Sequence, residues 1–127
     1  MQLSEVIDRL GLEVRSGHDR LAREVTGGYV SDLISDVLAH AGEGAVWVTL
    51  QRHQNIVAAA SMKELAGIVL VSGREPEDET LAKARLENIP LLVSRLPAFE
   101  LVGRLWDLGI GRQAATSAAT RPLARTQ

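Results

Sequence analysis

Three short, almost wholly apolar runs alternate along the chain with stretches of helical spacing. The runs are AVWVTL (45–50), AGIVLV (66–71) and IPLLV (89–93). They are rich in branched aliphatic residues and lack polar alternation, which predicts strands buried on both faces. The helical stretches span residues 55–65, 77–88 and 98–108. Strands that alternate with helices indicate βαβ units, so we expect a single α/β domain with a largely parallel sheet flanked by helices.

The residues before these units predict one further helix and one further strand. Apolar residues recur at helical spacing over residues 3–10, with Ser4 as the expected N-cap and Gly11 as the expected stop. Residues 12–15 alternate like a short, half-exposed strand, and the Ser16-Gly17 pair after them is a turn signal.

The segment 24–41 combines a β-type run, a glycine pair and a helix. The run Glu24-Val25-Thr26 is expected to end at Gly27-Gly28, where one glycine would hold a positive φ. Ser31-Asp32 is a polar pair that can cap a helix over residues 33–41. This layout presents backbone N–H groups at a helix start, so we expect the segment to contribute to a ligand-binding edge.

The composition narrows the classes of protein. The chain has 127 residues and a formal net charge of −2, which argues against a general nucleic-acid or anionic-membrane binder. It contains no cysteine, so disulfides and thiolate metal sites are excluded. No apolar run approaches the length of about 18 residues that a membrane span needs, and the N-terminus does not resemble a secretory signal. We therefore expect a cytoplasmic protein that binds neither membranes nor nucleic acids.

The end of the chain differs in composition from the rest. From Gly109 onward it carries three arginines, no acidic residue and little periodicity. Such a composition is typical of disorder. We therefore expect a folded domain over residues 1–110 and a disordered basic tail over residues 111–127.

Arginines recur where the predicted strands end. In an open parallel sheet the carboxyl ends of the strands meet at one edge, where helix N-termini converge and ligands bind. Arginine side chains and free backbone N–H groups favour a phosphate or a carboxylate there. The residues predicted to bind this anion are Thr26, Gly27, Gly28, Gln51, Arg52, His53, Asn55, Gly73, Arg74 and Arg95. The alternative is that these are solvated loop residues, with Arg74 only paired to Glu75 or Glu77.

Signals of catalysis and of metal binding are missing from the sequence. It has no Walker-type phosphate loop, and Gly109-Ile110-Gly111 follows a helix, whereas a dinucleotide fingerprint follows a strand. Asp32, Asp36 and His40 share a helix face, but the first and last are about 12 Å apart along the axis, too far for one ion. No matched acid, base and nucleophile is found. We therefore predict no enzyme activity, no cofactor and no metal.

Two segments together resemble the DRTGG domain family. They are EVTGGYVSDLISDVLAHAGEGAVWVTLQRHQNIVAAA (24–60) and LAGIVLVSGREPEDETLAKARLENIPLLVS (65–94). The motifs that carry the resemblance are TGG, SDL, the T-x-Q-x-H-x-N-I-V run from Thr49 and the GREP run from Gly73. The resemblance covers residues 3–110 and is closest to small, stand-alone members. The name-giving motif aligns with residues 24–28, where Glu24-Val25 replaces the Asp-Arg pair.

The resemblance implies an accessory α/β module, commonly self-associating, with no catalysis of its own. In larger relatives this module accompanies CBS domains in regulated pyrophosphatases and occurs in phosphotransacetylases, and the N-terminal domain of HPr kinase/phosphorylase has a similar fold. We therefore expect a non-catalytic regulatory or ligand-sensing module that binds a nucleotide or another phosphorylated or carboxylated small molecule. The alternatives are a structural protein that binds only a protein partner and, third, a small enzyme acting on a phosphorylated metabolite.

Self-association is also expected from the sequence itself. Residues 56–60, IVAAA, make the helix over 55–65 more apolar around its circumference than a surface helix needs. Small alanines permit close helix–helix approach, and two-fold dimers are the commonest oligomers, so we expect a homodimer. The alternative is that this helix is wedged between the sheet and its neighbours.

Overall fold

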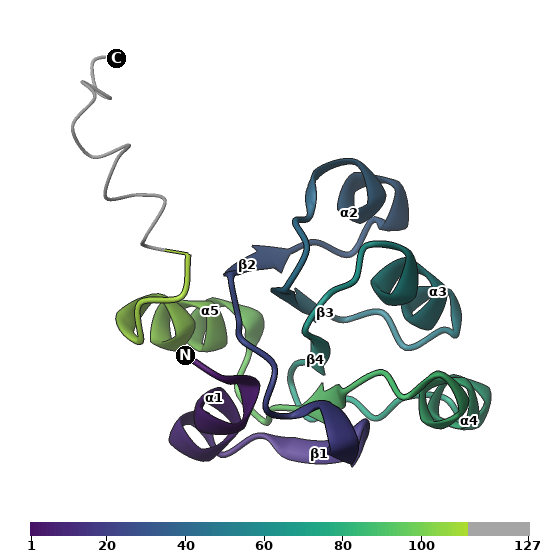
Figure 1. Ribbon diagram of the computed structural model, residues 1–127, viewed down its shortest axis with the longest axis horizontal. Helices are drawn as coiled ribbons and strands as arrows, with labels where there is room; N and C mark the ends of the chain where they lie inside the picture. The colour runs from purple at the N-terminus through teal and green to yellow at the C-terminus, as the bar shows by residue number, and fades with distance from the viewer. Residues whose placement is uncertain (112–127) are drawn as a thin grey trace.

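The computed structural model describes residues 1–111 of the chain (Figure 1). A five-stranded sheet forms its centre, in the order β1-β5-β4-β3-β2. The strands are β1 (Glu13–Ser16), β2 (Gly27–Val30), β3 (Ala45–Thr49), β4 (Gly67–Leu70) and β5 (Leu91–Val93). Strands β2 to β5 run parallel, and β1 pairs with β5 in the antiparallel sense. The predicted α/β domain with a largely parallel sheet is therefore confirmed. The predicted tail lies outside the described residues, apart from Gly111.

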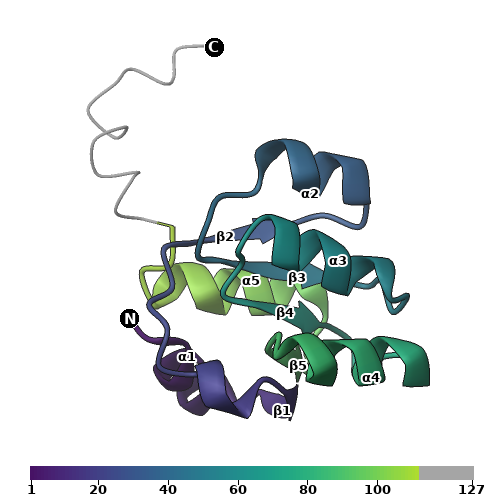
Figure 2. The same cartoon turned by 45° about the vertical axis from the view of Figure 1, so that its right-hand side comes forward.

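Helices cover both faces of the sheet. Figures 1 and 2 show α1 (Leu3–Leu10) and α5 (Ala98–Asp107) on one face, and α2 (Ile34–His40), α3 (Asn55–Met62) and α4 (Asp78–Glu87) on the other. A short 3-10 helix, η1 (His18–Arg20), follows β1.

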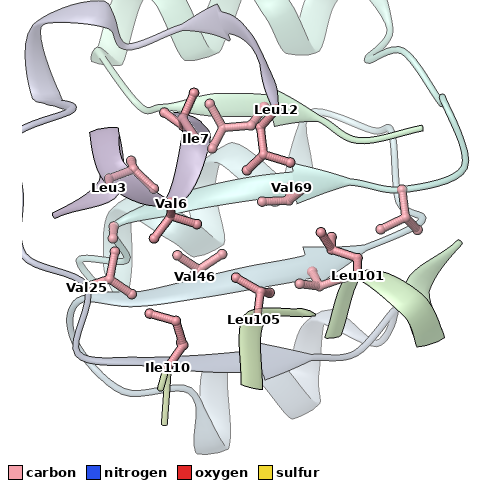
Figure 3. Close-up of a cluster of buried hydrophobic side chains, with 14 residues drawn as sticks. Leu3, Val6, Ile7, Leu12, Val25, Val46, Val69, Leu101, Leu105 and Ile110 are labelled. Carbon is pink, nitrogen blue, oxygen red and sulfur yellow. The ribbon is translucent and has the colours of Figure 1, made fainter. Parts of the chain in front are cut away.

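The alternation of side chains along β3 divides the core into two parts. Val46 and Val48 face α1 and α5, in the cluster that Figure 3 draws. Ala45 and Trp47 face α2 and α3 on the other side. All five residues of β3 are buried, as the unbroken apolar run predicts for a central strand covered on both faces.

Helix α1 begins with a different cap from the one predicted. Its N-cap is Gln2, and the backbone N–H of Gln2 donates to a carboxylate oxygen of Glu5 at 3.2 Å. This hydrogen bond satisfies a backbone donor at the start of the helix. The predicted cap Ser4 lies inside the helix. The predicted stop is confirmed, because Gly11 ends the helix in the left-handed conformation with φ 64°.

The glycine pair of segment 24–41 lies inside a strand instead of at its end. Gly27 and Gly28 open β2 and pair with Ala45 and Val46 of β3, and neither has a positive φ. The prediction of a glycine turn here is wrong. The strand lies later in the sequence than predicted: it begins at Gly27, where it was expected to end, and continues to Val30. Helix α2 begins correspondingly late, at Ile34.

Helix α3 does not present the free apolar surface on which the dimer prediction rested. Ile56, Val57, Ala59 and Ala60 are all buried within the chain, against the sheet and the flanking helices. The alternative of a wedged helix is therefore confirmed, and any self-association needs another surface.

Candidate functional site

A polar cleft lies at the edge of the sheet where β3 and β4 end. It has a volume of about 320 Å³. Its lining residues are Asp32, Leu50, Gln51, Arg52, His53, Arg74 and Glu77. Four of these were predicted from the sequence: Gln51, Arg52 and His53 follow β3, and Arg74 follows β4. The cleft is therefore built where parallel strands deliver their carboxyl ends.

Two arginines, Arg52 and Arg74, line the cleft, and each uses only its Nε in a hydrogen bond within the described residues. The Nε of Arg74 donates to the carbonyl oxygen of Leu50 at 2.9 Å, and the Nε of Arg52 donates to the carbonyl oxygen of Glu75. Among residues 1–111, neither arginine forms an ion pair. A guanidinium group has five N–H donors, so each side chain is held in place at Nε while its terminal nitrogens remain available. Such a fork matches a phosphate or a carboxylate.

The alternative that Arg74 only pairs with Glu75 or Glu77 is wrong, because among residues 1–111 Arg74 forms an ion pair with neither and Glu75 is bound by another arginine. Arg15 of β1 donates from Nε and from a terminal nitrogen to the two carboxylate oxygens of Glu75, at 2.8 and 2.7 Å. Arg15 also contacts Glu13 at 2.9 Å. These hydrogen bonds hold the pKa of Glu75 below its usual value and raise the pKa of Arg15. Glu75 is thus tied to the antiparallel edge strand.

The backbone beneath Arg52 is fixed by the start of α4. The carbonyl oxygen of Arg52 accepts a hydrogen bond of 2.6 Å from the hydroxyl of Thr80, which is fully buried, and one of 3.3 Å from the backbone N–H of Glu77. The loop after β3 is therefore anchored on the neighbouring βα unit. A cleft held in this way needs little rearrangement to receive a ligand.

The side chain of His53 bonds to the first residue of α3, one position beyond the N-cap Gln54. Its Nδ1 accepts the backbone N–H of Asn55 at 3.1 Å. In the neutral ring, Nδ1 is then the acceptor and Nε2 carries the proton. Asn55 was predicted both as the cap of this helix and as a ligand-binding residue. It is instead the first residue of α3, it is exposed, and it does not line the cleft.

Two carboxylates in the cleft were not predicted. Asp32 accepts hydrogen bonds from the hydroxyl of Thr49 at 2.9 Å and from the backbone N–H of Leu50 at 2.7 Å. Gln51 in turn donates from Nε2 to the carbonyl oxygen of Asp32 at 2.8 Å. Glu77 lies at the N-cap of α4. These carboxylates offset the two guanidinium charges, so a ligand with both anionic and hydrogen-bond-donating groups suits the cleft better than a bare anion.

The remaining predicted residues lie outside the cleft. Thr26, Gly27 and Gly28 lie at the opposite edge of the sheet, because β2 begins there beside the first residue of β3. The hydroxyl of Thr26 donates to the carbonyl oxygen of Glu43 at 2.6 Å.

Gly73 and Arg95 lie nearer to the cleft but do not line it. Gly73 has φ 68° and sits directly before Arg74, where a positive φ turns the chain after β4. Arg95 follows β5, its side chain is 86% exposed, and its Nε lies 3.3 Å from Glu13 of β1. The cleft is therefore smaller than the predicted site and is confined to the three βα loops that follow β2, β3 and β4.

Asp36 and His40 form a separate contact on α2. Asp36 accepts the hydroxyl of Tyr29 at 2.8 Å and lies 3.1 Å from Nδ1 of His40. The hydrogen bond from Tyr29 lowers the pKa of Asp36, while the pKa of Tyr29 is raised. Asp32 bonds to the end of β3 instead. Asp32, Asp36 and His40, which are spaced four residues apart in the sequence, therefore do not form one cluster. Within the described part of the chain, no group of three or more His, Asp or Glu side chains could hold a metal ion.

Comparison with known proteins places the fold. No family model matches the chain, and no curated protein matches it. Among solved structures, the chain is similar to the CBS and DRTGG domains of the regulatory region of Clostridium perfringens pyrophosphatase, complexed with its activator diadenosine tetraphosphate. The TM-score is 0.66 at 17% sequence identity, over 80% of this chain. The match spans 44% of the length of that structure, so the chain corresponds to part of it.

At 17% sequence identity the comparison shows similarity of fold alone. The α/β fold of the chain is DRTGG-like, in agreement with the resemblance of its sequence. Within residues 1–111, no helix has the length and apolar character needed to cross a membrane.

Proposed function

We propose that the chain is a non-catalytic regulatory or ligand-sensing module whose cleft binds a small molecule with a phosphate or carboxylate group. The observation that carries the proposal is the pair Arg52 and Arg74, which share one cleft without an ion pair among the described residues. Two buttressed guanidinium groups on adjacent loops can bind one anionic group from two sides.

The size and the charge of the cleft favour a polar metabolite over a large apolar one. Its volume of about 320 Å³ lies at the lower end of small-molecule sites, which take about 300–1,000 Å³. Asp32 and Glu77 add acceptors for hydroxyl or amino groups of the same ligand. The similar regulatory region was crystallised with a dinucleotide polyphosphate, which supports nucleotides as the first compounds to test.

Replacing Arg74 by alanine is expected to weaken ligand binding by tenfold or more, because each charged hydrogen bond contributes about 1.5–3 kcal/mol. The probes are inorganic phosphate, AMP, ATP, diadenosine tetraphosphate and citrate, first by thermal shift and then by calorimetric titration. A bound ligand raises the apparent stability by mass action, so the first screen needs no assay of activity.

Arg95→Ala is the matched control, since it removes an exposed arginine at the same edge but outside the cleft. It is expected to leave binding unchanged. Equal affinity of the wild type and Arg74→Ala would place the site elsewhere. If no probe binds the wild type at millimolar concentration, the proposal fails and a module that binds only a protein partner becomes the better account.

Replacing Asp32 by asparagine is expected to tighten the binding of inorganic phosphate about fivefold, because this probe lacks the sugar and base groups that the carboxylate could accept from. The substitution removes a negative charge from the cleft, and a charge at such an exposed site contributes about 1 kcal/mol. The asparagine oxygen can still accept the hydrogen bonds from Thr49 and Leu50, so the loop is expected to keep its structure. Asp107→Asn on α5, remote from the cleft, is the control in the same titration. Weaker binding of phosphate by Asp32→Asn would contradict the view that this carboxylate offsets the guanidinium charges of the cleft.

A further inference from the structure

A carboxylate able to neutralise Arg52 lies beside the cleft and is held by another residue. The Nε of Arg52 donates to the backbone carbonyl oxygen of Glu75, so the guanidinium group of Arg52 lies against this residue. The carboxylate of Glu75 instead accepts two hydrogen bonds from Arg15 of β1, at 2.8 and 2.7 Å. Glu75 therefore contacts both arginines, Arg52 through its backbone and Arg15 through its side chain.

The positive charge of Arg52 already acts on this carboxylate. The hydrogen bonds from Arg15 lower the pKa of Glu75 most, and the charge of Arg52 lowers it further. The side chain of Glu75 is 52% exposed, so it has room to rotate. A carboxylate released from Arg15 is expected to turn towards Arg52, because opposite charges attract and the guanidinium group is held beside the same residue.

Arg15 lies at an irregular point of β1. It is the extra residue between Val14 and Ser16, which pair with consecutive residues of β5, so the strand has a β-bulge here. A bulge changes the direction in which a side chain leaves the strand. The hydroxyl of Ser16 donates to the carbonyl oxygen of Ile89 at 2.7 Å in a buried position, which fixes the strand directly after the bulge. The local structure of β1 thus holds Arg15 where it can bind Glu75.

We propose that Arg15 is a positioning residue of the cleft: by binding the carboxylate of Glu75, it keeps this group from pairing with Arg52 and leaves Arg52 available to an anionic ligand. The inference rests on the proposed function, since it concerns the same cleft. Arg15 does not line the cleft, so its effect on the ligand is indirect. The carboxylate of Glu75 and the ligand compete for the terminal nitrogens of Arg52, because both are anions that suit the same fork of donors.

A second role for Arg15 must be separated from this one. Arg15 could contribute only by fastening the loop after β4 to β1. Under that role, removing either partner of the Arg15–Glu75 pair would disturb the loop in the same way, and removing both would not help. If Arg15 instead keeps Glu75 from Arg52, the loss of Arg15 is harmful only while the carboxylate of Glu75 is present.

The first test titrates inorganic phosphate into the full chain, followed by NMR chemical shifts at fixed pH and ionic strength. Arg15→Ala is expected to weaken phosphate binding about five- to tenfold, because Arg52 becomes paired internally. Glu75→Gln is expected to bind phosphate no more weakly than the wild type. The double variant Arg15→Ala/Glu75→Gln is expected to return to within about twofold of the wild type, a rescue that loss of a loop contact would not show.

Two comparisons set the limits of this effect. Arg15→Ala should weaken binding no more than Arg52→Ala, and in the Arg52→Ala background it should have no further effect, because the two changes act on the same group. Glu13→Gln is the matched control. It removes the other carboxylate that Arg15 contacts, at 2.9 Å, and leaves the pair of Arg15 with Glu75 in place. It is expected to bind phosphate like the wild type.

The second test needs no ligand. The pKa of Glu75 is measured by carboxyl ¹³C NMR in the wild type, Arg15→Ala, Arg52→Ala and the variant with both changes. Arg74 and Glu77 are charged neighbours on the same loop and are present in all four proteins. A nearby positive charge lowers the pKa of a carboxyl group. Removing Arg52 is therefore expected to raise the pKa of Glu75 more in the absence of Arg15 than in its presence.

Three results would overturn the proposal. Wild-type affinity of Arg15→Ala for phosphate, with Arg74→Ala weakened, would leave the proposed function standing and remove the role of Arg15. A double variant as weak as Arg15→Ala would show that Arg15 only fastens the loop. An effect of Arg52 on the pKa of Glu75 that does not depend on Arg15 would show that the released carboxylate does not turn to Arg52. If phosphate does not bind the wild type, the proposed function fails for this probe, and the pKa measurement alone decides whether Arg15 keeps Glu75 from Arg52.

Discussion

Replacing Gly17 by alanine is expected to destabilise the folded chain by about 3 kcal/mol or more. Gly17 follows β1 with φ 78°, a conformation that disfavours any side chain. A Cβ at this position would lie 2.4 Å from the backbone nitrogen of Pro90 and 2.7 Å from the carbonyl carbon of Ile89. Because these are backbone atoms at the start of β5, the clash can be relieved only by separating β1 from β5.

Gly11→Ala is the matched control for this substitution. Gly11 has φ 64°, but nothing lies within 4 Å of its would-be Cβ. Alanine there should cost only the left-handed conformation, about 1 kcal/mol. Urea unfolding followed by circular dichroism measures both variants against the wild type. Equal midpoints for Gly17→Ala and Gly11→Ala would contradict the close approach of the chain to Pro90.

The central part of the fold is predictable because its signals are local and strong. The unbroken apolar runs of β3 and β4 can be satisfied only by strands covered on both faces. The pairing of β1 with β5 is different, since residues 12–15 carry no signal for a partner strand that lies far along the chain. The register is set instead by contacts such as the buried bond of 2.7 Å from the hydroxyl of Ser16 to the carbonyl oxygen of Ile89.

The residues of the candidate site can be predicted only where the ends of the strands before them are predicted correctly. The loops after β3 and β4 meet as expected, which brings Arg52 and Arg74 together. Asp32 was missed because the preceding strand was ended too early, at Thr26 instead of Val30. With β2 in its observed place, Asp32 follows a parallel strand next to β3 and must lie at the same edge. Arg95 lies outside the cleft, and its Nε is 3.3 Å from Glu13 of the antiparallel β1, a neighbour that the sequence did not predict.

Helix α3 shows why apolar content alone does not identify an interface. Its alanine-rich sequence is used inside the domain, where small side chains let it lie close to the sheet between α2 and α4. Helix α5 has a more ordinary amphipathic sequence, yet it exposes two aromatic side chains. The sequence cannot distinguish these cases, because which side of a helix meets the sheet depends on how the whole helix packs.

Replacing Trp47 by alanine is expected to destabilise the chain by about 3–5 kcal/mol. Trp47 lies at the centre of β3 and is the largest fully buried side chain among the described residues. Its Nε1 also donates to the carbonyl oxygen of Ser31 at 2.8 Å, which ties the loop before α2 to the sheet. Alanine would leave a large cavity beneath α2 and α3 and remove this bond. Since a domain of this size has a stability of about 5–15 kcal/mol, the variant should retain only part of it.

Two further variants separate the contributions of Trp47. Trp47→Phe keeps most of the ring but has no N–H, so it is expected to fall between the wild type and alanine, at about 1–3 kcal/mol. Trp106→Ala is the control for loss of an indole elsewhere, and at low micromolar concentration it is expected to cost less than about 1 kcal/mol, because its ring is half exposed. Urea unfolding by far-ultraviolet circular dichroism is the common measurement, since it does not depend on tryptophan fluorescence. If Trp47→Ala and Trp106→Ala unfolded at the same midpoint, Trp47 would not be the central packing residue of this face of the sheet.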